Sequence, residues 1–226
     1  MKIYIIGLGG IGSALISPLG KFLKYNQIDI EAIYLIDGDT VEENNLSRQN
    51  FIITDINRAK SDVMAEYLRL FGQKVISIPR YIASEADCQF EEGSVIFVGV
   101  DNYVTRYLIE QKCKELKNIL IIFGGNEYHD GDVNVIFIKN GKLMTPLYSE
   151  TYPELKERDK FPTDQSCAEA SVHAPQLIFA NITVANMMLG CFYSFLERMK
   201  GGLEQLPIIY NNQFDLRTNA YLGKSI

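Results

Sequence analysis

The sequence predicts an α/β protein in which helices cover both faces of a doubly wound, mixed sheet. Short aliphatic and β-branched runs recur along the first half of the chain, at Lys2 to Ile6, Ala32 to Ile36 and Ser94 to Gly99. Each run ends in glycine or acidic residues and leads into a stretch with helical periodicity, which is the alternation of parallel βαβ units. At 226 residues we expect one continuous domain with a substantial core.

The composition excludes several classes of protein. Apolar residues make up 47% of the chain and the net charge is -6, which argues against disorder and against a general attraction to nucleic acid. No apolar run reaches the ~20 residues that span a bilayer, so we expect no membrane segment. The four cysteines form no CxxC pair, so neither a zinc site nor a disulfide framework is expected, and a cytoplasmic location fits best; they are Cys88, Cys113, Cys167 and Cys191.

Four glycines, Gly7, Gly9, Gly10 and Gly12, separate the first strand from a helical pattern. Glycines let a backbone approach phosphate without a Cβ, and the helix N-terminus presents free amide donors to an anion. Tight packing of a helix on a strand selects glycine as well, so this motif alone does not decide. Asp37 at the end of the second strand adds a carboxylate that can accept a ribose hydroxyl, which favours a Rossmann-like nucleotide site.

The segment from Tyr34 to Phe51 adds a second acid, Asp39, and then Arg48. An arginine is unexpected in a redox dinucleotide site, but its planar guanidinium suits phosphate oxygens. A helix is predicted from residue 54, capped by Thr54 or Asp55, with Lys60 in its first turn or just before it. A lysine there opposes the helix dipole; it is either a solvated side chain or a second ligand for the same phosphates.

Two further buried strands are predicted at Lys74 to Pro79 and Ser94 to Gly99, and the second is followed by Asp101. Ligands in open α/β sheets sit at the carboxyl ends of the strands, so Asp101 can hold Mg²⁺ beside phosphate. The alternative is that Asp101 caps the helix that starts near Tyr103. The two roles are compatible.

Five separated motifs in this order resemble the ThiF/MoeB/HesA family, to which the ubiquitin-activating enzymes belong. They are Gly7-x-Gly9-Gly10-x-Gly12, Asp37-x-Asp39-x-Val41, Asn45-Leu46-x-Arg48-Gln49, Lys60 and Asp101-Asn102-x-x-x-Arg106. The resemblance covers about the first half of the chain, and five motifs in register are more specific than one glycine loop.

The resemblance implies a ThiF/MoeB-like adenylation domain. Such a domain uses ATP and Mg²⁺ to adenylate the C-terminal carboxylate of a ubiquitin-like protein. Carried over to this sequence, Asp37 accepts the ribose hydroxyls and Asp101 binds Mg²⁺. Arg48 and Lys60 neutralise the phosphates, while Asn45 and Gln49 help to place the triphosphate.

The second half extends this core. A strand at Ile119 to Phe123 precedes two apolar runs joined at Asn140-Gly141, which predicts a tight hairpin in an antiparallel extension. We assign residues 1–148 to the nucleotide-binding core. Residues 149–226 are expected to hold a long crossover loop up to Ser166, a cysteine-bearing segment, a long apolar helix from Leu177 to Phe195, and one or two closing strands.

Cys167 stands between the charged loop and the start of a helical pattern, where access and a helix dipole favour a reactive thiol. The sequence around it, TDQSCAEA, resembles ThiF-like members encoded in bacterial mobile elements of the PRTRC type. We hypothesise that Cys167 attacks the acyl adenylate and carries the partner as a thioester. The alternative is a small buried hydrophobe. His173 could assist it, and Cys191 is interpreted as a core residue.

Family members are usually dimers, so a homodimer is expected, with a conjugating enzyme or a sulfur-transfer protein as a further partner. Some relatives lend an arginine to the neighbouring subunit, a role open here to Arg58 or Arg106. Three other functions remain. Adenylation could serve a sulfur carrier without a lasting thioester, the fold could be an NAD-binding oxidoreductase, or it could be a noncatalytic nucleotide-binding scaffold.

Overall fold

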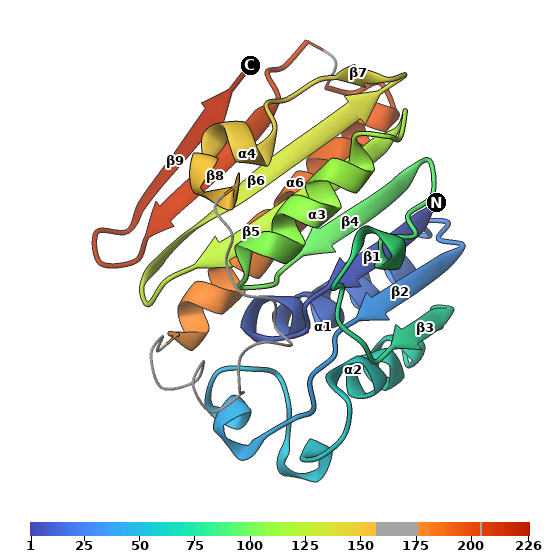
Figure 1. The fold of residues 1–226 in the computed structure, drawn as a ribbon, viewed down its shortest axis with the longest axis vertical. Helices are drawn as coiled ribbons and strands as arrows, with labels where there is room; N and C mark the ends of the chain where they lie inside the picture. The colour runs from blue at the N-terminus through green and yellow to red at the C-terminus, as the bar shows by residue number, and fades with distance from the viewer. Residues whose placement is uncertain (157–175, 204) are drawn as a thin grey trace.

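The computed structural model describes residues 1–156, 176–203 and 205–226. Within these ranges nine strands form one sheet in the order β3-β2-β1-β4-β5-β6-β8-β9, with β7 paired to β6 (Figure 1). The strands are β1 (Lys2–Ile6), β2 (Ala32–Ile36), β3 (Val75–Ile78), β4 (Ser94–Val98), β5 (Ile119–Asn126), β6 (Asp130–Lys139), β7 (Lys142–Leu143), β8 (Ile209–Asp215) and β9 (Ala220–Ser225). The α-helices are α1 (Gly10–Tyr25), α2 (Lys60–Arg69), α3 (Tyr103–Cys113), α4 (Tyr148–Thr151) and α6 (Ile178–Met199). Short 3-10 turns occupy Glu43–Ser47, Ile53–Asp55, Glu85–Asp87 and Pro153–Lys156.

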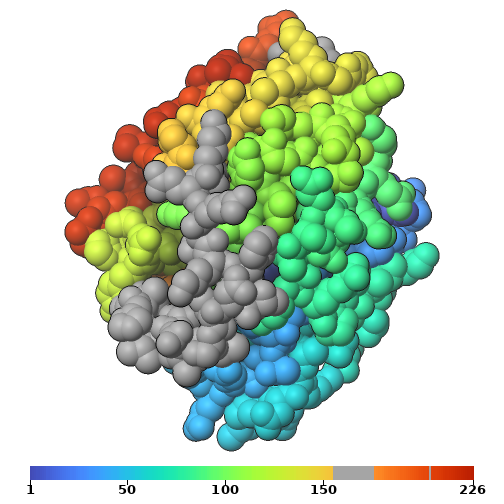
Figure 2. All heavy atoms as spheres, in the orientation of Figure 1, coloured from blue at the N-terminus to red at the C-terminus, as the bar shows by residue number. Residues whose placement is uncertain are grey.

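Helices cover both faces of the sheet, which confirms the predicted doubly wound architecture. The helices α1, α2 and α6 lie on one face and α3 and α4 on the other (Figure 1). Successive side chains of a strand point to opposite faces, so Ile3 and Ile5 enter the first core while Tyr4 and Ile6 enter the second. In Figure 2 the light-blue and cyan segments that follow β2 gather at the lower end of one face, and the red C-terminal strands lie at its upper left.

The four parallel strands β3, β2, β1 and β4 lie where the apolar runs predict them, and β5 continues the parallel set. Buried parallel strands read as continuous apolar runs, which explains why their limits were easy to place. The prediction of a buried strand at 74–79 is wrong in one respect. Strand β3 ends the sheet and has one neighbour, so only Val75 of its four residues is buried.

The antiparallel extension is confirmed. Strand β6 runs antiparallel to β5 and pairs with both β7 and β8, and β9 closes the sheet beyond β8. The hairpin between β6 and β7 turns at Asn140 and Gly141, whose φ angles are 52° and 75°. A two-residue turn with φ positive at both positions matches the twist of the flanking strands, which is why Asn-Gly predicts it.

The segment after β7 is less irregular than the predicted loop from residue 149. Helix α4 and the 3-10 turn Pro153–Lys156 occupy its first part. Two side chains of α3 hold the start of α4: Arg106 Nη1 donates to Tyr148 Oη (2.8 Å), and Glu110 accepts from the amide and hydroxyl of Ser149 (2.8 and 2.6 Å). These contacts join residues about 40 apart, so no local pattern could indicate them. The rest of the predicted crossover loop lies outside the described residues.

Helix α6 confirms the predicted long apolar helix, with ends at Ile178 and Met199. By length and composition it could cross a membrane. Its inward face, however, is part of the first core, where the ring of Phe192 meets those of Phe22 in α1 and Phe97 in β4. These ring contacts place one face of α6 in the core, while much of its apolar surface lies outside it.

Two cysteines lie in the second core. Cys88 and Cys113 are fully buried beside α3. Burial raises the pKa of both thiols, that of Cys88 to about 12, because a thiolate is poorly solvated among apolar side chains. Both are therefore inert structural residues in the folded chain.

The turn from β1 into α1 brings backbone against backbone. Gly7 has φ +83°, and a Cβ on it would meet the backbone of Gly99 and Val100 at 2.8 to 2.9 Å. A Cβ on Gly12 would lie 1.9 Å from the carbonyl oxygen of Gly7. These two glycines of the motif are therefore required by the fold itself, before any ligand is considered.

Gly12→Ala is expected to lower the free energy of unfolding by roughly 3 kcal/mol, because the new methyl group must displace the Gly7 carbonyl. Gly190→Ala is the matched control. Gly190 lies inside α6, and no described residue comes within 4 Å of its Cβ position, so alanine should raise stability by about 1 kcal/mol through helix propensity. Urea unfolding followed by circular dichroism measures both. Equal effects of the two substitutions would contradict the close approach at Gly12.

Candidate functional site

Three neighbouring strands end at one edge of the sheet. β1 lies between β2 and β4, and Ile6 pairs with Ile36 on one side and Val98 on the other. The amide of Gly7 donates to Ile36 O (2.9 Å), and the amide of Gly99 donates to Ile6 O (2.8 Å). Three segments therefore leave the sheet at the same edge: the glycine turn after β1, the segment with Asp37 and Asp39 after β2, and the segment with Asp101 after β4. The connections diverge on either side of β1, and this is where open α/β sheets bind ligands.

Asp37 is buried at this edge. Its Oδ2 accepts from the amide of Leu8 in the glycine turn (2.5 Å), and its Oδ1 accepts from the amide of Asp39 (2.8 Å). Burial raises the pKa of Asp37 to about 6, with the Lys60 cation opposing this rise and Asp39 adding to it. Each carboxylate oxygen has a second lone pair, so Asp37 can still accept a hydrogen bond from a ligand.

Asp39 holds the lysine. Lys60 Nζ donates to Asp39 Oδ2 at 2.8 Å, the Lys60 side chain is only 6% exposed, and the Lys60 amide donates to Asp39 O (3.0 Å). Lys60 is the first residue of α2, as predicted. The alternative of a solvated lysine is wrong, because the ammonium group of Lys60 is buried in an ion pair with Asp39. The predicted nucleotide residue Asp39 thus has a clear structural role, which is to offset a cation placed against the helix dipole.

The predicted cap of this helix is wrong. Thr54 and Asp55 lie in a separate 3-10 turn, where Asp55 Oδ2 accepts from the amide of Ile52 (3.0 Å). Helix α2 begins only after Ala59, without a side-chain cap. Pairing of the chain around Thr40 with that around Ala59 fixes this start, and such a tertiary contact is invisible in a local capping pattern.

Tyr81 belongs to the site and was missed by the sequence analysis. Its hydroxyl donates to Asp39 Oδ1, and its ring occupies the space that a Cβ on Gly38 would need. Gly38 therefore separates the two acids because an aromatic ring lies against the backbone there. The one sequence signal for Tyr81 is its position just after β3, at the same edge of the sheet.

Asn45 organises the turn that leads to Arg48. Its Oδ1 accepts from the amide of Glu42 (3.0 Å) and its Nδ2 donates to Asn44 Oδ1 (2.8 Å). Its carbonyl accepts from the amides of both Arg48 (3.1 Å) and Gln49 (2.9 Å). The Asn45 side chain is thus engaged within the protein, and its effect on a ligand would pass through the position of Arg48.

Three buried polar atoms near the glycine turn have no hydrogen-bond partner in the described part of the chain. They are Arg48 Nε, Gln49 Oε1 and Asn181 Oδ1. Gln49 Nε2 lies 3.8 Å from the Cβ position of Gly9, and Asn181 donates from Nδ2 to Arg48 O (3.1 Å). Unpaired buried polar groups cost free energy, so their grouping indicates a place built for a polar ligand.

Asp101 lies at the end of β4 with an exposed side chain. The alternative that it caps α3 is wrong: the cap is Asn102, whose Oδ1 accepts from the amide of Thr105 (2.9 Å). Asp101 is therefore free to hold a cation. Among the described residues no three His, Cys, Asp or Glu side chains group to form a metal site. A single carboxylate fits Mg²⁺, which takes one or two carboxylates together with substrate phosphates and water.

Arg106 is not available to the nucleotide. Besides Tyr148, its guanidinium donates to Val100 O (2.9 Å) and Gly124 O (2.7 Å), and the side chain is buried. The expectation that it substitutes for an arginine from a second subunit is therefore wrong. Arg58 is partly exposed and pairs with Glu66 (2.5 Å).

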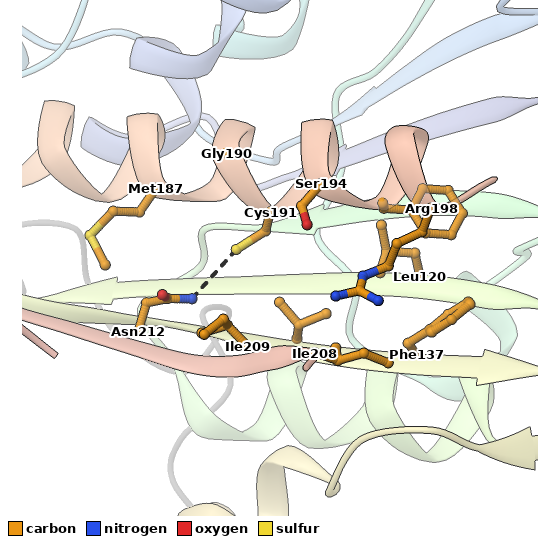
Figure 3. A pocket seen from close by; sticks show the side chains of 12 residues that line it. Leu120, Phe137, Met187, Gly190, Cys191, Ser194, Arg198, Ile208, Ile209 and Asn212 are labelled. Carbon is orange, nitrogen blue, oxygen red and sulfur yellow. Dashed lines mark hydrogen bonds between the residues drawn. The ribbon is translucent and has the colours of Figure 1, made fainter. Parts of the chain in front are cut away.

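Cys167 and His173 lie outside the described residues. Cys191 is only half-buried, so its interpretation as a core residue is wrong in part. It lines an apolar pocket of about 320 Å³ between α6 and strands β5, β6 and β8 (Figure 3). In that pocket Asn212 Nδ2 donates to Cys191 Sγ (3.6 Å). No predicted nucleotide residue lines it.

Comparisons with known proteins show which family the chain is similar to. The model of the ThiF family matches residues 1–219. A probable molybdopterin-synthase adenylyltransferase of Pyropia yezoensis is 30% identical over 162 residues, which are 70% of this chain and 41% of that protein. The adenylyltransferase and sulfurtransferase UBA4 of Yarrowia lipolytica is 27% identical over 177 residues, 77% of this chain and 41% of that protein.

Solved structures show the same fold. E. coli MccB with ATP has a TM-score of 0.72 at 20% identity, over 99% of this chain and 63% of that chain. PaaA has a TM-score of 0.70 at 18% identity, over 100% of this chain and 64% of that chain. The chain spans about two fifths of the length of the two curated relatives, from Pyropia yezoensis and Yarrowia lipolytica. The fold is Rossmann-like, and the chain belongs to the ThiF family.

Proposed function

We propose that this chain is the ATP-dependent adenylation domain of an enzyme that activates a ubiquitin-like or sulfur-carrier protein. The observation that carries the proposal is Arg48 Nε, a buried guanidinium donor without a partner in the described residues, beside the glycine turn. A phosphate oxygen is the acceptor that such a donor suits best. The helix α1 adds its free N-terminal amides at the same place.

The relatives point to the same chemistry. They include proteins named as adenylyltransferases, the NEDD8-activating enzyme E1 catalytic subunit of Caenorhabditis elegans and the SAMP-activating enzyme E1 of Haloferax volcanii. Each of these names is that of an adenylating or an activating enzyme. We infer the activity of the whole protein from these names together with the site.

In the proposed reaction a carboxylate oxygen of the partner's C-terminus attacks the α-phosphorus of ATP. The bond from that phosphorus to the bridging oxygen breaks, pyrophosphate leaves, and an acyl adenylate forms. Asp37 accepts a ribose hydroxyl, while Arg48 and Lys60 stabilise the negative charge that grows on the phosphates. Mg²⁺ held by Asp101 would supply further neutralisation of the pyrophosphate.

For the second step we propose that the Cys167 thiolate attacks the acyl carbon and AMP leaves, so that a thioester forms. Transfer of sulfur to the adenylate without a lasting thioester is the runner-up, supported by relatives named sulfurtransferases. A cytoplasmic homodimer that meets a conjugating enzyme or a sulfur-transfer protein is part of the same proposal. No zinc is required by the described residues of the site.

Two other functions have less support. An NAD-binding oxidoreductase would use the glycine turn and Asp37, but it leaves the buried Lys60 and the unpaired Arg48 without a role. A noncatalytic scaffold would keep the fold and bind nucleotide, yet it requires neither the buried Lys60 nor the Arg48 donor that is unpaired among the described residues. Binding of NAD but not of Mg·ATP would favour the oxidoreductase. Full biological activity of a variant that lacks both Lys60 and Arg48 would favour the scaffold.

Lys60→Ala and Arg48→Ala are each expected to lower kcat/KM for ATP–pyrophosphate exchange by about 10²- to 10³-fold, because each removes a fixed cation from the phosphates. The measurement is exchange of labelled pyrophosphate with a candidate ubiquitin-like protein present. Lys114→Ala, which removes an exposed cation of α3's C-cap, is the control and should be unaffected. Unchanged exchange in both site variants would overturn the adenylation proposal.

Cys167→Ala is expected to keep pyrophosphate exchange and to lose any thiol-labile adduct with the partner, because only the second step needs the thiol. Intact-mass spectrometry under nonreducing conditions, with Mg·ATP and the partner, measures the adduct. Cys191→Ala is the control that should retain it. Adenylated partner without any adduct on the wild-type enzyme would refute the thioester and favour the sulfur-transfer route.

The KM for ATP is expected to fall as pH rises from 5 to about 7 and then to level off. Burial raises the pKa of Asp37 to about 6, so the carboxyl gains a proton as pH falls through this value and becomes a weaker acceptor for a ribose hydroxyl. Asp37→Asn cannot ionise and should show a higher KM at pH 7 without this step. ATP titrates in the same range, so the difference between the two profiles is the informative quantity. Parallel profiles would contradict the role of Asp37.

A further inference from the structure

Asn181 of α6 reaches the nucleotide site from the far end of the sequence. Its side chain is 1% exposed, and its Nδ2 donates to the carbonyl oxygen of Arg48 at 3.1 Å. The two residues are 133 positions apart in the chain. This bond ties the backbone of the phosphate-binding arginine to a helix that belongs to the other half of the protein.

The same amide explains Gly10. A Cβ on Gly10 would lie 2.2 Å from Asn181 Nδ2 and 2.6 Å from Asn181 Oδ1. Gly10 is the first residue of α1. It is therefore a glycine because the Asn181 amide fills the volume beside it. Among the described residues, Gln49 Nε2 at 3.8 Å is the one neighbour of the Gly9 Cβ position, so Gly9 is the more open of the two middle glycines.

The orientation of the amide follows from its partner. A carbonyl oxygen only accepts hydrogen bonds, so the nitrogen of Asn181 must face Arg48. The oxygen is then fixed on the other side of the amide, where it is buried without a donor among the described residues. An apolar side chain of similar size would fill this space without that cost. The presence of Asn181 here in spite of that cost indicates that its hydrogen bond to Arg48 is needed.

We propose that Asn181 is a positioning residue of the nucleotide site, which locks the backbone of Arg48 to the start of α1 through α6. The proposal rests on the proposed function, since it assigns Asn181 the task of presenting Arg48 to the phosphates of ATP. It predicts that stability and nucleotide binding respond differently to changes at this contact.

The first measurement is thermal unfolding of Gly10→Ala, Asn181→Ala and the double variant. Gly10→Ala alone should lower Tm by several degrees, because its methyl group overlaps the Asn181 amide. The double variant should recover most of this loss, because the methyl group then occupies the space left by the amide. Additive losses in the double variant would show that the two residues are not in contact and would overturn the proposal.

The second measurement is the Kd for Mg·ATP, from calorimetry. Asn181→Ala should weaken binding about tenfold, as expected for a lost hydrogen bond that fixes a charged group. The double variant should remain equally weak although its Tm has recovered. Asn186→Ala changes an exposed asparagine of the same helix and should bind as the wild type does.

The outcomes separate this inference from the proposed function. Wild-type affinity in the double variant would mean that Asn181 only packs against Gly10, and the positioning role would fall while ATP binding stands. Absence of Mg·ATP binding by the wild-type protein would overturn the proposed function together with this role. Recovered stability with a persistent tenfold loss of affinity supports the role of Asn181.

Discussion

The close approach of backbone to backbone at the first turn is the constraint on which the rest of the site depends. Gly12 sits against the Gly7 carbonyl, and Gly7 against the chain that follows β4. Because β1 lies between β2 and β4, the path of this turn fixes where the acids after β2 and the carboxylate after β4 emerge. Any side chain at Gly7 or Gly12 would move the start of α1 away from that edge.

Charge at this edge is arranged before any ligand arrives. Two acids face one buried lysine, and the pair formed by Asp39 and Lys60 offsets the unfavourable placement of a cation at the start of α2. Asp37 is left with two backbone donors and a raised pKa. A ribose hydroxyl and a set of phosphates would satisfy what the protein leaves open, which are a carboxylate acceptor and the guanidinium donor of Arg48.

Much of the fold could be predicted from the sequence, because buried parallel strands are continuous apolar runs and the Asn140-Gly141 turn has its own signature. A local pattern failed where a tertiary contact decides, because pairing of Thr40 with Ala59 sets the start of α2. At α3 the error is only one residue, since the cap is Asn102 and not Asp101. Asn181 carries no local signal of its contact with Arg48, since it lies within an apolar helical run. Its partner Arg48 lies 133 residues away, and nothing short of the fold brings them together.

The two thiols of the second core can report local unfolding of this protein. Cys88 comes from the segment before β4 and Cys113 from the end of α3, and neither exposes any surface in the folded chain. A thiol reagent reaches them only when that face of the sheet separates from α3, so their rate of modification follows the free energy of local unfolding. Measuring this rate with and without added Mg·ATP would therefore tell whether the nucleotide stabilises the second core or leaves it unchanged.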